Sequence, residues 1–450
     1  MREPFTKQVL QDIASFNNRY LGGILANLFE SHPELQEEIA DSIIGAIAAK
    51  ENGANDVLII ERDVELGGIL LQCIHNGFGL ELFNEDMPGP TYAQYFIDQV
   101  RGLGVETLMD TMVLDITHDL KIFAINKDLG YLELQARAVV LAMGCRERTR
   151  AQIMLPGARP AGVYSAGTAQ RFVNVEGHMP GENFVILGSG DIGMIMARRL
   201  TSEGAQVQRV LEIMPYLTGL TRNYVQCLLD YGITLQKQRT VHRIIGNDRV
   251  EAIEAVSVDE KWQPIPGSKE IIPCDTLLLS VGLIPENELS KKAGVKLDPI
   301  TNGPIVDDRF MTNVPGIFAA GNVVHVYDLV DWVTEAGRVA GKSAALYAQA
   351  EKMETSPEVE LTAGENIRYV VPHKMDKNHL AEDLVRLQMR AIVPIEERVL
   401  VTVEDQNGEV IARKAEPYAR PGEILTLAIK PSAYEAVQKA TSLTVNVRKR

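Results

Sequence analysis

Residues 183–212 read NFVILGSGDIGMIMARRLTSEGAQVQRVLE, and this stretch decides the fold. It opens with an apolar run of strand type, directly followed by the glycines of a G-x-G-x-x-G pattern, Gly188, Gly190 and Gly193. A helix is expected next, and a second strand ends in Glu212. In such a unit the glycines make a tight turn, let a pyrophosphate reach the backbone and bring helix and strand close together. The stretch therefore predicts a dinucleotide-binding βαβ unit.

The residues around this turn indicate which dinucleotide binds. Asp191 and Ile192 open the expected helix, whose free N–H groups are predicted to carry the phosphates. Glu212 lies 22 residues after Gly190, where an acid can bind both hydroxyls of an unphosphorylated ribose. No arginine follows it within IMPYL, residues 213–217. NAD is therefore favoured over NADP.

Composition and charge exclude several other classes of protein. The 450 residues are too many for one core, and a formal charge of −15 without a long basic run speaks against nucleic acid as a partner. The four cysteines lie far apart and form no metal-binding spacing, which predicts reduced thiols and no metal site. No apolar run approaches the ~20 residues of a membrane span. We expect a soluble, cytoplasmic protein of several domains.

A second nucleotide-type unit is suggested by residues 40–68, ADSIIGAIAAKENGANDVLIIERDVELGG. A helix of small residues is followed by an apolar strand, and Glu61 stands where an acid would hold a ribose hydroxyl. The glycine turn that should precede the helix is absent, because the sequence there reads LQEEIADSII. Residues 1–40 look helical instead, so we expect the first strand of this unit to be lacking.

Four further stretches occur in a fixed order: ERDVELGG (61–68), VVLAMGCRER (139–148), TLLLSVGLIPENELS (276–290) and TNVPGIFAAGNVV (312–324). Together with the glycine turn they resemble the two-dinucleotide flavoproteins of the pyridine nucleotide-disulfide oxidoreductase superfamily. The resemblance covers roughly residues 44–350 and implies FAD and NAD as cofactors. The sequence departs from the superfamily because it lacks the first G-x-G-x-x-G motif.

The resemblance also implies which residues hold the cofactors. Besides the turn, they are Glu61, Gly67, Gly68, Gly144, Gly282, Gly321, Asn322 and Leu329. Asn322 stands where the superfamily has an aspartate that hydrogen-bonds the ribityl chain, and an amide can keep that contact with less charge. The helix that follows Leu329 would direct its positive N-terminus at the pyrimidine edge of the flavin and stabilise the anionic reduced form. The same helix would pack on a sheet in any case.

A narrower resemblance rests on QCIHNGFGLELF (72–83), GCRERTR (144–150), EIMPYLTGLTRN (212–223) and GNVVHVYDLVDWV (321–333). These stretches are similar to a branch found with glycerol-3-phosphate, opine and amino-acid dehydrogenase partners. By analogy, the expected partners are a small-molecule substrate and a second flavoprotein dehydrogenase subunit.

The predicted fold is α/β, with two Rossmann-like domains and a small C-terminal β domain. The first Rossmann-like domain is discontinuous and N-terminally incomplete, and we expect the following boundaries: 1–40, an atypical helical segment; 41–150 and 283–352, the FAD-type domain; 151–282, the NAD-binding domain; 353–366, a linker; and 367–450, the C-terminal β domain. Within the last, Asn407-Gly408 predicts a hairpin turn.

Candidate catalytic residues follow the Gly67-Gly68 pair. Disulfide reductases keep C-x-x-x-x-C there, but Cys73 stands alone, so thiol–disulfide chemistry would need a partner that the sequence does not supply. A lone cysteine is more often a small buried hydrophobe. His75 and Asn76 fall where they would face the flavin ring, and His75 is either a proton-handling residue or a structural histidine.

Two functions remain open on the sequence. The first is a flavin-dependent oxidoreductase that transfers a hydride between NAD(H) and FAD, with a further substrate at His75 and Asn76. The second is a flavin-free NAD-binding or structural component of a heteromeric dehydrogenase. Retention of Glu61 and the GIFAAGN motif favours the first, and the missing glycine turn favours the second.

Overall fold

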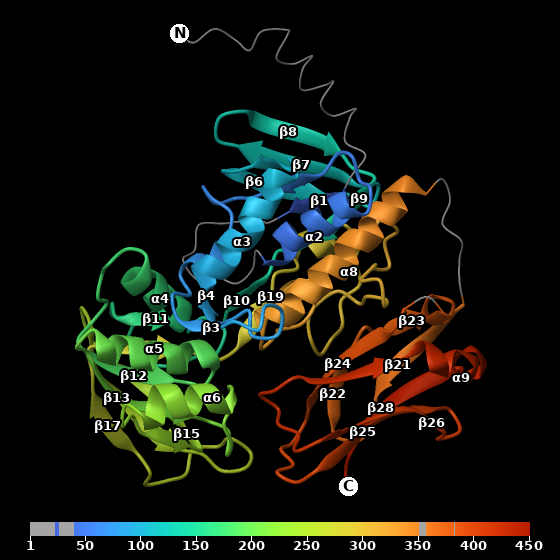
Figure 1. The fold of residues 1–450 in the computed structure, drawn as a ribbon. Helices are drawn as coiled ribbons and strands as arrows, with labels where there is room; N and C mark the ends of the chain where they lie inside the picture. The colour runs from blue at the N-terminus through green and yellow to red at the C-terminus, as the bar shows by residue number, and fades with distance from the viewer. Residues whose placement is uncertain (1–22, 27–39, 351–356, 382) are drawn as a thin grey trace, which may run out of the picture.

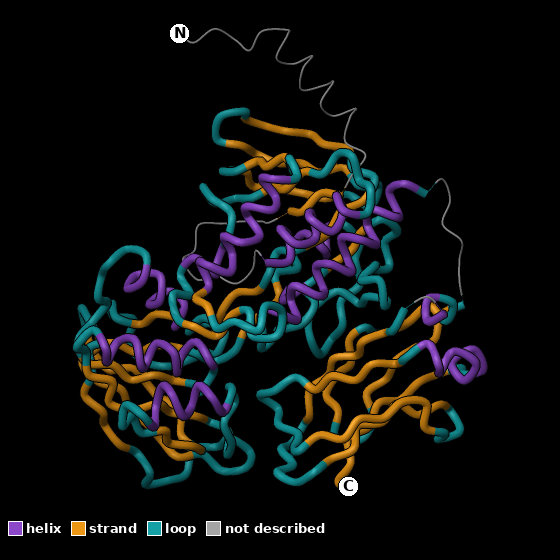
Figure 2. The backbone as a smooth tube through the Cα atoms, in the orientation of Figure 1, coloured by secondary structure: helices purple, strands orange, loops and turns teal. Residues whose placement is uncertain are grey.

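The computed structural model describes residues 23–26, 40–350, 357–381 and 383–450. The described elements form three bodies: two built on five-stranded parallel sheets and a C-terminal body made almost entirely of strands (Figures 1 and 2). This confirms the predicted α/β class with two dinucleotide-type units and a small β domain. In the described ranges, no helix is both long and apolar enough to cross a membrane.

The first body is a parallel sheet with helices on one face and a small sheet on the other. Its strands, in spatial order, are β20 (Ile317–Ala319), β9 (Ala138–Leu141), β1 (Gly23–Ala26), β2 (Leu58–Ile60) and β5 (Glu106–Leu108). One face packs on α2 (Ala40–Glu51), α3 (Gly89–Gly102) and α8 (Val330–Gln349). The other face packs on the antiparallel strands β6 (Thr111–Ile116), β7 (Lys121–Asn126) and β8 (Gly130–Gln135). Strands β2 and β9 are buried along their whole length because both faces are covered.

Strand β1 corrects the expectation that the first strand is lacking. It lies at the centre of the sheet and pairs in parallel with β2 on one side and β9 on the other. Residues 23–26 are therefore strand, not helix. The sequence GILA hid this strand because a central parallel strand shows no polar alternation, and four residues are too few to identify it. Residues 27–39, where a phosphate-binding turn would lie, are outside the described part of the chain.

The second body carries the stretch that decided the fold. Its sheet has the order β11 (Val163–Ser165), β18 (Thr276–Leu279), β12 (Asn183–Leu187), β13 (Gln206–Glu212) and β14 (Leu235–Lys237). Helix α5 (Asp191–Ser202) connects β12 to β13, as predicted. Packed beside the sheet are α4 (Ala166–Asn174) and the antiparallel strands β15 (Arg239–Gly246), β16 (Val250–Ser257) and β17 (Glu270–Pro273).

Two short crossover strands join the first and second bodies. They are β10 (Cys145–Glu147) and β19 (Leu283–Pro285), which pair in antiparallel fashion. Arg146 on β10 donates to Glu286 at 2.7 Å, directly after β19. The crossovers predicted around Gly144 and Gly282 therefore lie side by side.

The C-terminal body is a sandwich of two sheets. One has the order β23 (Lys374–Asp376), β21 (Glu358–Ala363), β28 (Ser442–Lys449), β25 (Val399–Asp405) and β26 (Val410–Glu416). The other has the order β22 (Ile367–Val371), β24 (Val385–Ala391) and β27 (Leu425–Ile429). The hairpin predicted at Asn407-Gly408 joins β25 to β26.

Strand β21 shows that the linker expected over 353–366 is wrong from residue 358 onward. Val359 and Leu361 are buried, whereas Glu358 and Glu360, which alternate with them along the strand, are exposed. This is the alternation of a half-buried strand, which the polar composition of EVELTA concealed. Residues 353–356 lie outside the described ranges.

Candidate functional site

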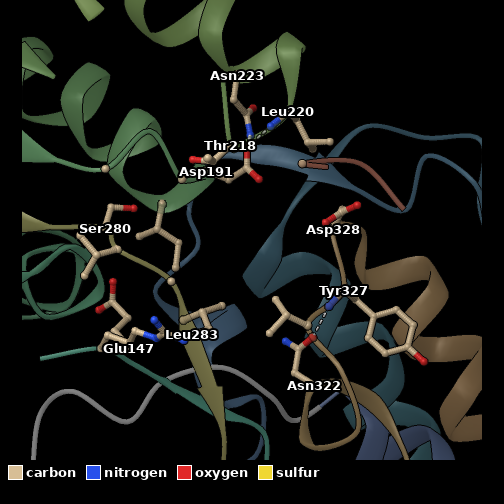
Figure 3. Close-up of a pocket in the computed structure, with 18 of the residues that line it drawn as sticks. Glu147, Asp191, Thr218, Leu220, Asn223, Ser280, Leu283, Asn322, Tyr327 and Asp328 are labelled. Atoms are coloured by element: carbon tan, nitrogen blue, oxygen red, sulfur yellow. Dashed lines mark hydrogen bonds between the residues drawn. The ribbon is translucent and has the colours of Figure 1, made fainter. Parts of the chain in front are cut away.

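One cavity of about 880 Å³ lies between the three bodies, and each body supplies part of its wall. The first body contributes Cys73, His75 and Asn76 together with the loop before α8. The second contributes the glycine turn and the chain that follows β13. The C-terminal body contributes the residues Arg368, Tyr369, Arg390, Pro421 and Gly422. Figure 3 shows part of this wall.

The glycine turn at the end of β12 is packed too tightly for any other residue at its first position. Gly188 has φ +100°, and a Cβ atom on it would lie 1.9 Å from the backbone oxygen of Ser280. A Cβ on Gly193 would meet the side chain of Ser280, whose Oγ accepts a hydrogen bond from Gly193 N at 3.1 Å. Helix α5 starts after Gly190, and Asp191 and Ile192 at its beginning line the cavity, so the positive end of the helix dipole faces the cavity side of the turn.

Two carboxylates hold the chain after β13 against this turn. Glu212 is buried and accepts hydrogen bonds from Ser189 N at 2.8 Å and Met214 N at 2.8 Å. Asp191 accepts from Leu220 N at 2.8 Å and from the Asn223 side chain at 2.6 Å, as Figure 3 shows. Burial raises the pKa of Asp191 to about 6. The predicted role of Glu212 toward ribose hydroxyls stays a prediction.

The residues after Gly67-Gly68 lie on the opposite wall. The Cys73 sulfur is 3.9 Å from Oε1 of Gln170 in the second body, and His75 Nδ1 is 2.9 Å from the backbone oxygen of Asn76. Burial lowers the pKa of His75, and the positive charges of Arg198 and Arg222 lower it further, against the opposing effect of the hydrogen bond to the Asn76 oxygen. The ring is therefore neutral at pH 7 and can accept a proton.

The loop between β20 and α8 forms the floor beside these residues. Asn322 is buried, and its Oδ1 accepts a hydrogen bond from Tyr327 N at 2.6 Å (Figure 3). Leu329 precedes α8 directly, so the N-terminus of this 20-residue helix points at the cavity.

The C-terminal body binds this same loop through an ion pair that sequence reasoning missed. Arg390 on β24 pairs with Asp328 and donates to Tyr369 OH at 3.0 Å and to the Val326 oxygen at 2.9 Å. Ile424 N donates to the other carboxylate oxygen of Asp328 at 2.6 Å. The one available signal was the position of Arg390 between the apolar residues Met389 and Ala391.

His325, in the same loop, gives a testable pH dependence. It is 1% exposed between Tyr369 and Gln388, and burial lowers its pKa from 6.5 to about 3. As the pH falls below 6.5, His325 binds a proton in the unfolded chain but stays neutral in the folded chain. Proton binding favours the unfolded chain, so the free energy of unfolding falls between pH 6.5 and 3. Wild type should thus lose up to about 1.4 kcal/mol per pH unit relative to His325→Gln.

Urea unfolding at pH 7.5, 6.0 and 5.0 measures this difference. His118→Gln, in the exposed turn between β6 and β7, is the matched control and should follow wild type at each pH. A constant difference between wild type and His325→Gln across this range would contradict the prediction.

The structure brings together most, but not all, of the predicted site residues. Those that line the cavity are Cys73, His75, Asn76, Gly188, Gly190, Asp191, Ile192, Glu212, Gly282, Asn322 and Leu329. Those outside its wall are Glu61, Gly67, Gly68, Gly144, Gly193 and Gly321. In the described ranges no three His, Cys, Asp or Glu side chains are grouped to hold a metal ion.

Both cofactor types fit residues that are present. The glycine turn offers a dinucleotide a backbone cradle that a Cβ atom would fill. For FAD, Glu61 is buried at the carboxyl end of β2, next to the central strand β1, which is where such sheets bind a ribose. Gly67 and Gly68 both have positive φ and turn the chain from Glu61 toward Cys73.

The chain is similar to known proteins over most of its described length. The family described as pyridine nucleotide-disulphide oxidoreductase matches residues 42–355. One of the opine oxidase subunits of Agrobacterium tumefaciens is 27% identical over 230 residues, covering 48% of this chain and 44% of that protein. NADH oxidase from Methanocaldococcus jannaschii is 27% identical over 274 residues, covering 55% and 56%. The chain thus spans about half the length of these curated relatives.

Solved structures share the fold. Thioredoxin reductase from T. acidophilum superposes with a TM-score of 0.58 at 21% identity, over 73% of this chain and 98% of that one. A ferredoxin reductase from Rhodopseudomonas palustris gives 0.53 at 17% identity, over 93% of each chain. With a family match over more than half of its length, the chain belongs to the pyridine nucleotide-disulphide oxidoreductase family of FAD- and NAD(P)H-dependent oxidoreductases.

Proposed function

We propose that the protein transfers a hydride between NAD(H) and FAD and exchanges electrons with a second substrate or a partner subunit. One observation carries this proposal: the glycine turn at Gly188 and the flavin-side residues His75 and Asn322 line a single cavity. A dinucleotide whose pyrophosphate is held by the turn can therefore bring its nicotinamide to a flavin held by the loop without crossing the protein. FAD, when bound, supplies the hydride-accepting ring and a route to a second electron partner.

The residues of the chain have distinct tasks in this reaction. Asp191 and Glu212 fix the turn and the chain after β13, so the dinucleotide meets a rigid wall. His75, neutral at pH 7, can take up a proton at its free ring nitrogen. The C-terminal body excludes water, because Arg390 and Arg420 bind it to the first and second bodies; Arg420 donates to Thr221 Oγ1 at 2.7 Å.

We infer that NAD is preferred over NADP and that the work is shared with a partner subunit. A buried carboxylate at Glu212 beside the turn would repel the 2′-phosphate of NADP. The similarity to a protein named as one of the subunits of opine oxidase supports an assembly with a second flavoprotein. We also propose a cytoplasmic location, because the four cysteines lie far apart in the chain and none belongs to a C-x-x-C motif.

The visible spectrum of the purified protein, taken anaerobically before and after addition of NADH, tests the function. We expect flavin absorption that bleaches with NADH, because both cofactors reach the same cavity. A protein that stays colourless when FAD is added would refute the oxidoreductase proposal for this chain. It would favour the flavin-free NAD-binding protein instead.

A further inference from the structure

A second, smaller cavity lies behind His75 and Asn76. It has a volume of about 350 Å³ and shares these two residues and Ile195 with the main cavity. Its remaining polar wall comes from Asn174 at the end of α4 and from α5 residues Arg198, Arg199 and Ser202. The two cavities are therefore neighbours, and the segment that carries the candidate proton-handling histidine lines both of them.

The charge of this side cavity is positive. Two guanidinium groups line it and no carboxylate does. Arg199 pairs with Glu203, one turn along α5, at 2.9 Å, but Arg198 forms no ion pair with any described residue. A carboxylate matches the planar fork of an arginine by two parallel hydrogen bonds.

Two buried polar atoms in this wall have no hydrogen-bond partner, and they are of opposite kind. One is Nε of Arg199, a donor, and the other is Oδ1 of Asn174, an acceptor. Exchanging the oxygen and nitrogen positions of the Asn174 amide would break a hydrogen bond, because Nδ2 donates to the Gln72 oxygen at 2.8 Å. Leaving such atoms unpaired costs roughly 1–3 kcal/mol each, so a ligand that pairs both would bind favourably.

We propose that the side cavity binds a small carboxylate that also carries a hydroxyl or ammonium donor. The carboxylate pairs with Arg198 and Arg199, and the donor group faces Oδ1 of Asn174. Resting on the proposed function, this ligand is the second substrate, placed next to His75. The volume suits a molecule of metabolite size.

Calorimetric titration with two small dicarboxylate probes, tartronate and malonate, in the absence of NAD(H), tests the site. Both are dianions of the same length, and only tartronate has a hydroxyl group. We expect tartronate to bind the wild-type protein about tenfold more tightly than malonate, because only its hydroxyl satisfies Asn174. Asn174→Ala should bring the two affinities close together.

The arginine contribution is measured with Arg198→Ala and Arg198→Lys, which should each weaken both probes by about tenfold or more. Arg198→Lys keeps the charge and so guards against misfolding, while losing the fork. Arg101→Ala, an exposed arginine at the end of α3 that lines neither cavity, is the control and should bind as wild type. The proposal would be overturned if the wild-type protein bound the two probes with equal affinity or bound neither. It would also be overturned if the Arg198 variants bound the probes as tightly as the control. Bleaching of the flavin by NADH in the same preparation, without probe, reports separately on the proposed function.

Discussion

Replacing Gly188 with alanine is expected to remove dinucleotide binding and to destabilise the second body by more than about 3 kcal/mol. The new Cβ atom would lie 1.9 Å from the backbone oxygen of Ser280, and the residue would have to keep φ +100°, which alanine avoids. The clash is with backbone, so β12 and the strand end at Ser280 must separate. Moving the turn also displaces the start of α5, and NADH affinity should fall roughly 100-fold or more.

Gly190→Ala is the matched comparison for this prediction. Gly190 has φ −66°, which alanine adopts easily, and an added Cβ would approach the Ser280 hydroxyl, which can rotate by giving up the hydrogen bond from Gly193 N. Stability should fall by only about 1 kcal/mol, the contribution of that hydrogen bond, while the added methyl group hinders the pyrophosphate. Urea unfolding and NADH titration measure the two effects separately. If Gly188→Ala unfolds at the same urea concentration as Gly190→Ala, the packing argument is wrong.

The sequence predicted the second body well because its signal is local. The turn at Gly188, the helix that follows and the acid Glu212 are set by residues close together in the chain, and each has its own physical requirement. The helix before residue 350 and the hairpin at Asn407-Gly408 were predicted for the same reason.

The errors arose where a strand depends on distant neighbours. Strand β1 is defined by pairing with Leu58–Ile60 and Ala138–Leu141. The four residues of β1 contain no local pattern that predicts this pairing. Strand β21 is likewise defined by its pairing with Ser442–Lys449 at the other end of the domain. At both places the local composition favours a helix or a linker, but pairing with distant strands makes the segment a strand.

In the candidate site, too, residues within local motifs were predicted and residues brought in by distant contacts were missed. Cys73, His75 and Asn322 were placed through motifs, whereas Arg390 and Tyr369 reach the cavity only because the C-terminal body folds back onto the loop before α8. No sequence pattern links residue 390 to residue 328. The charge on Asp328 is therefore held by a partner that only the assembled structure provides.

Replacing Arg390 with methionine is expected to destabilise the protein by roughly 3 kcal/mol, at the lower end of the range for breaking a buried ion pair. The two side chains are only 14% and 10% exposed, so Asp328 would be left with a charge that neither water nor arginine stabilises. Burial already raises the pKa of Asp328, and loss of Arg390 would raise it further. Because Asp328 precedes the start of α8, the purified variant should also retain less flavin.

The double variant Arg390→Met with Asp328→Asn separates the ion pair from simple packing. Asparagine removes the stranded charge but still accepts from Ile424 N, so the double variant should be more stable than Arg390→Met alone. Urea unfolding gives the free energies for the cycle, and absorbance of the bound flavin per protein reports on the loop. If the double variant were no more stable than Arg390→Met, the loss would come from missing packing around the arginine stem. Asp328 would then play no electrostatic part in fastening the C-terminal body to the flavin-side loop.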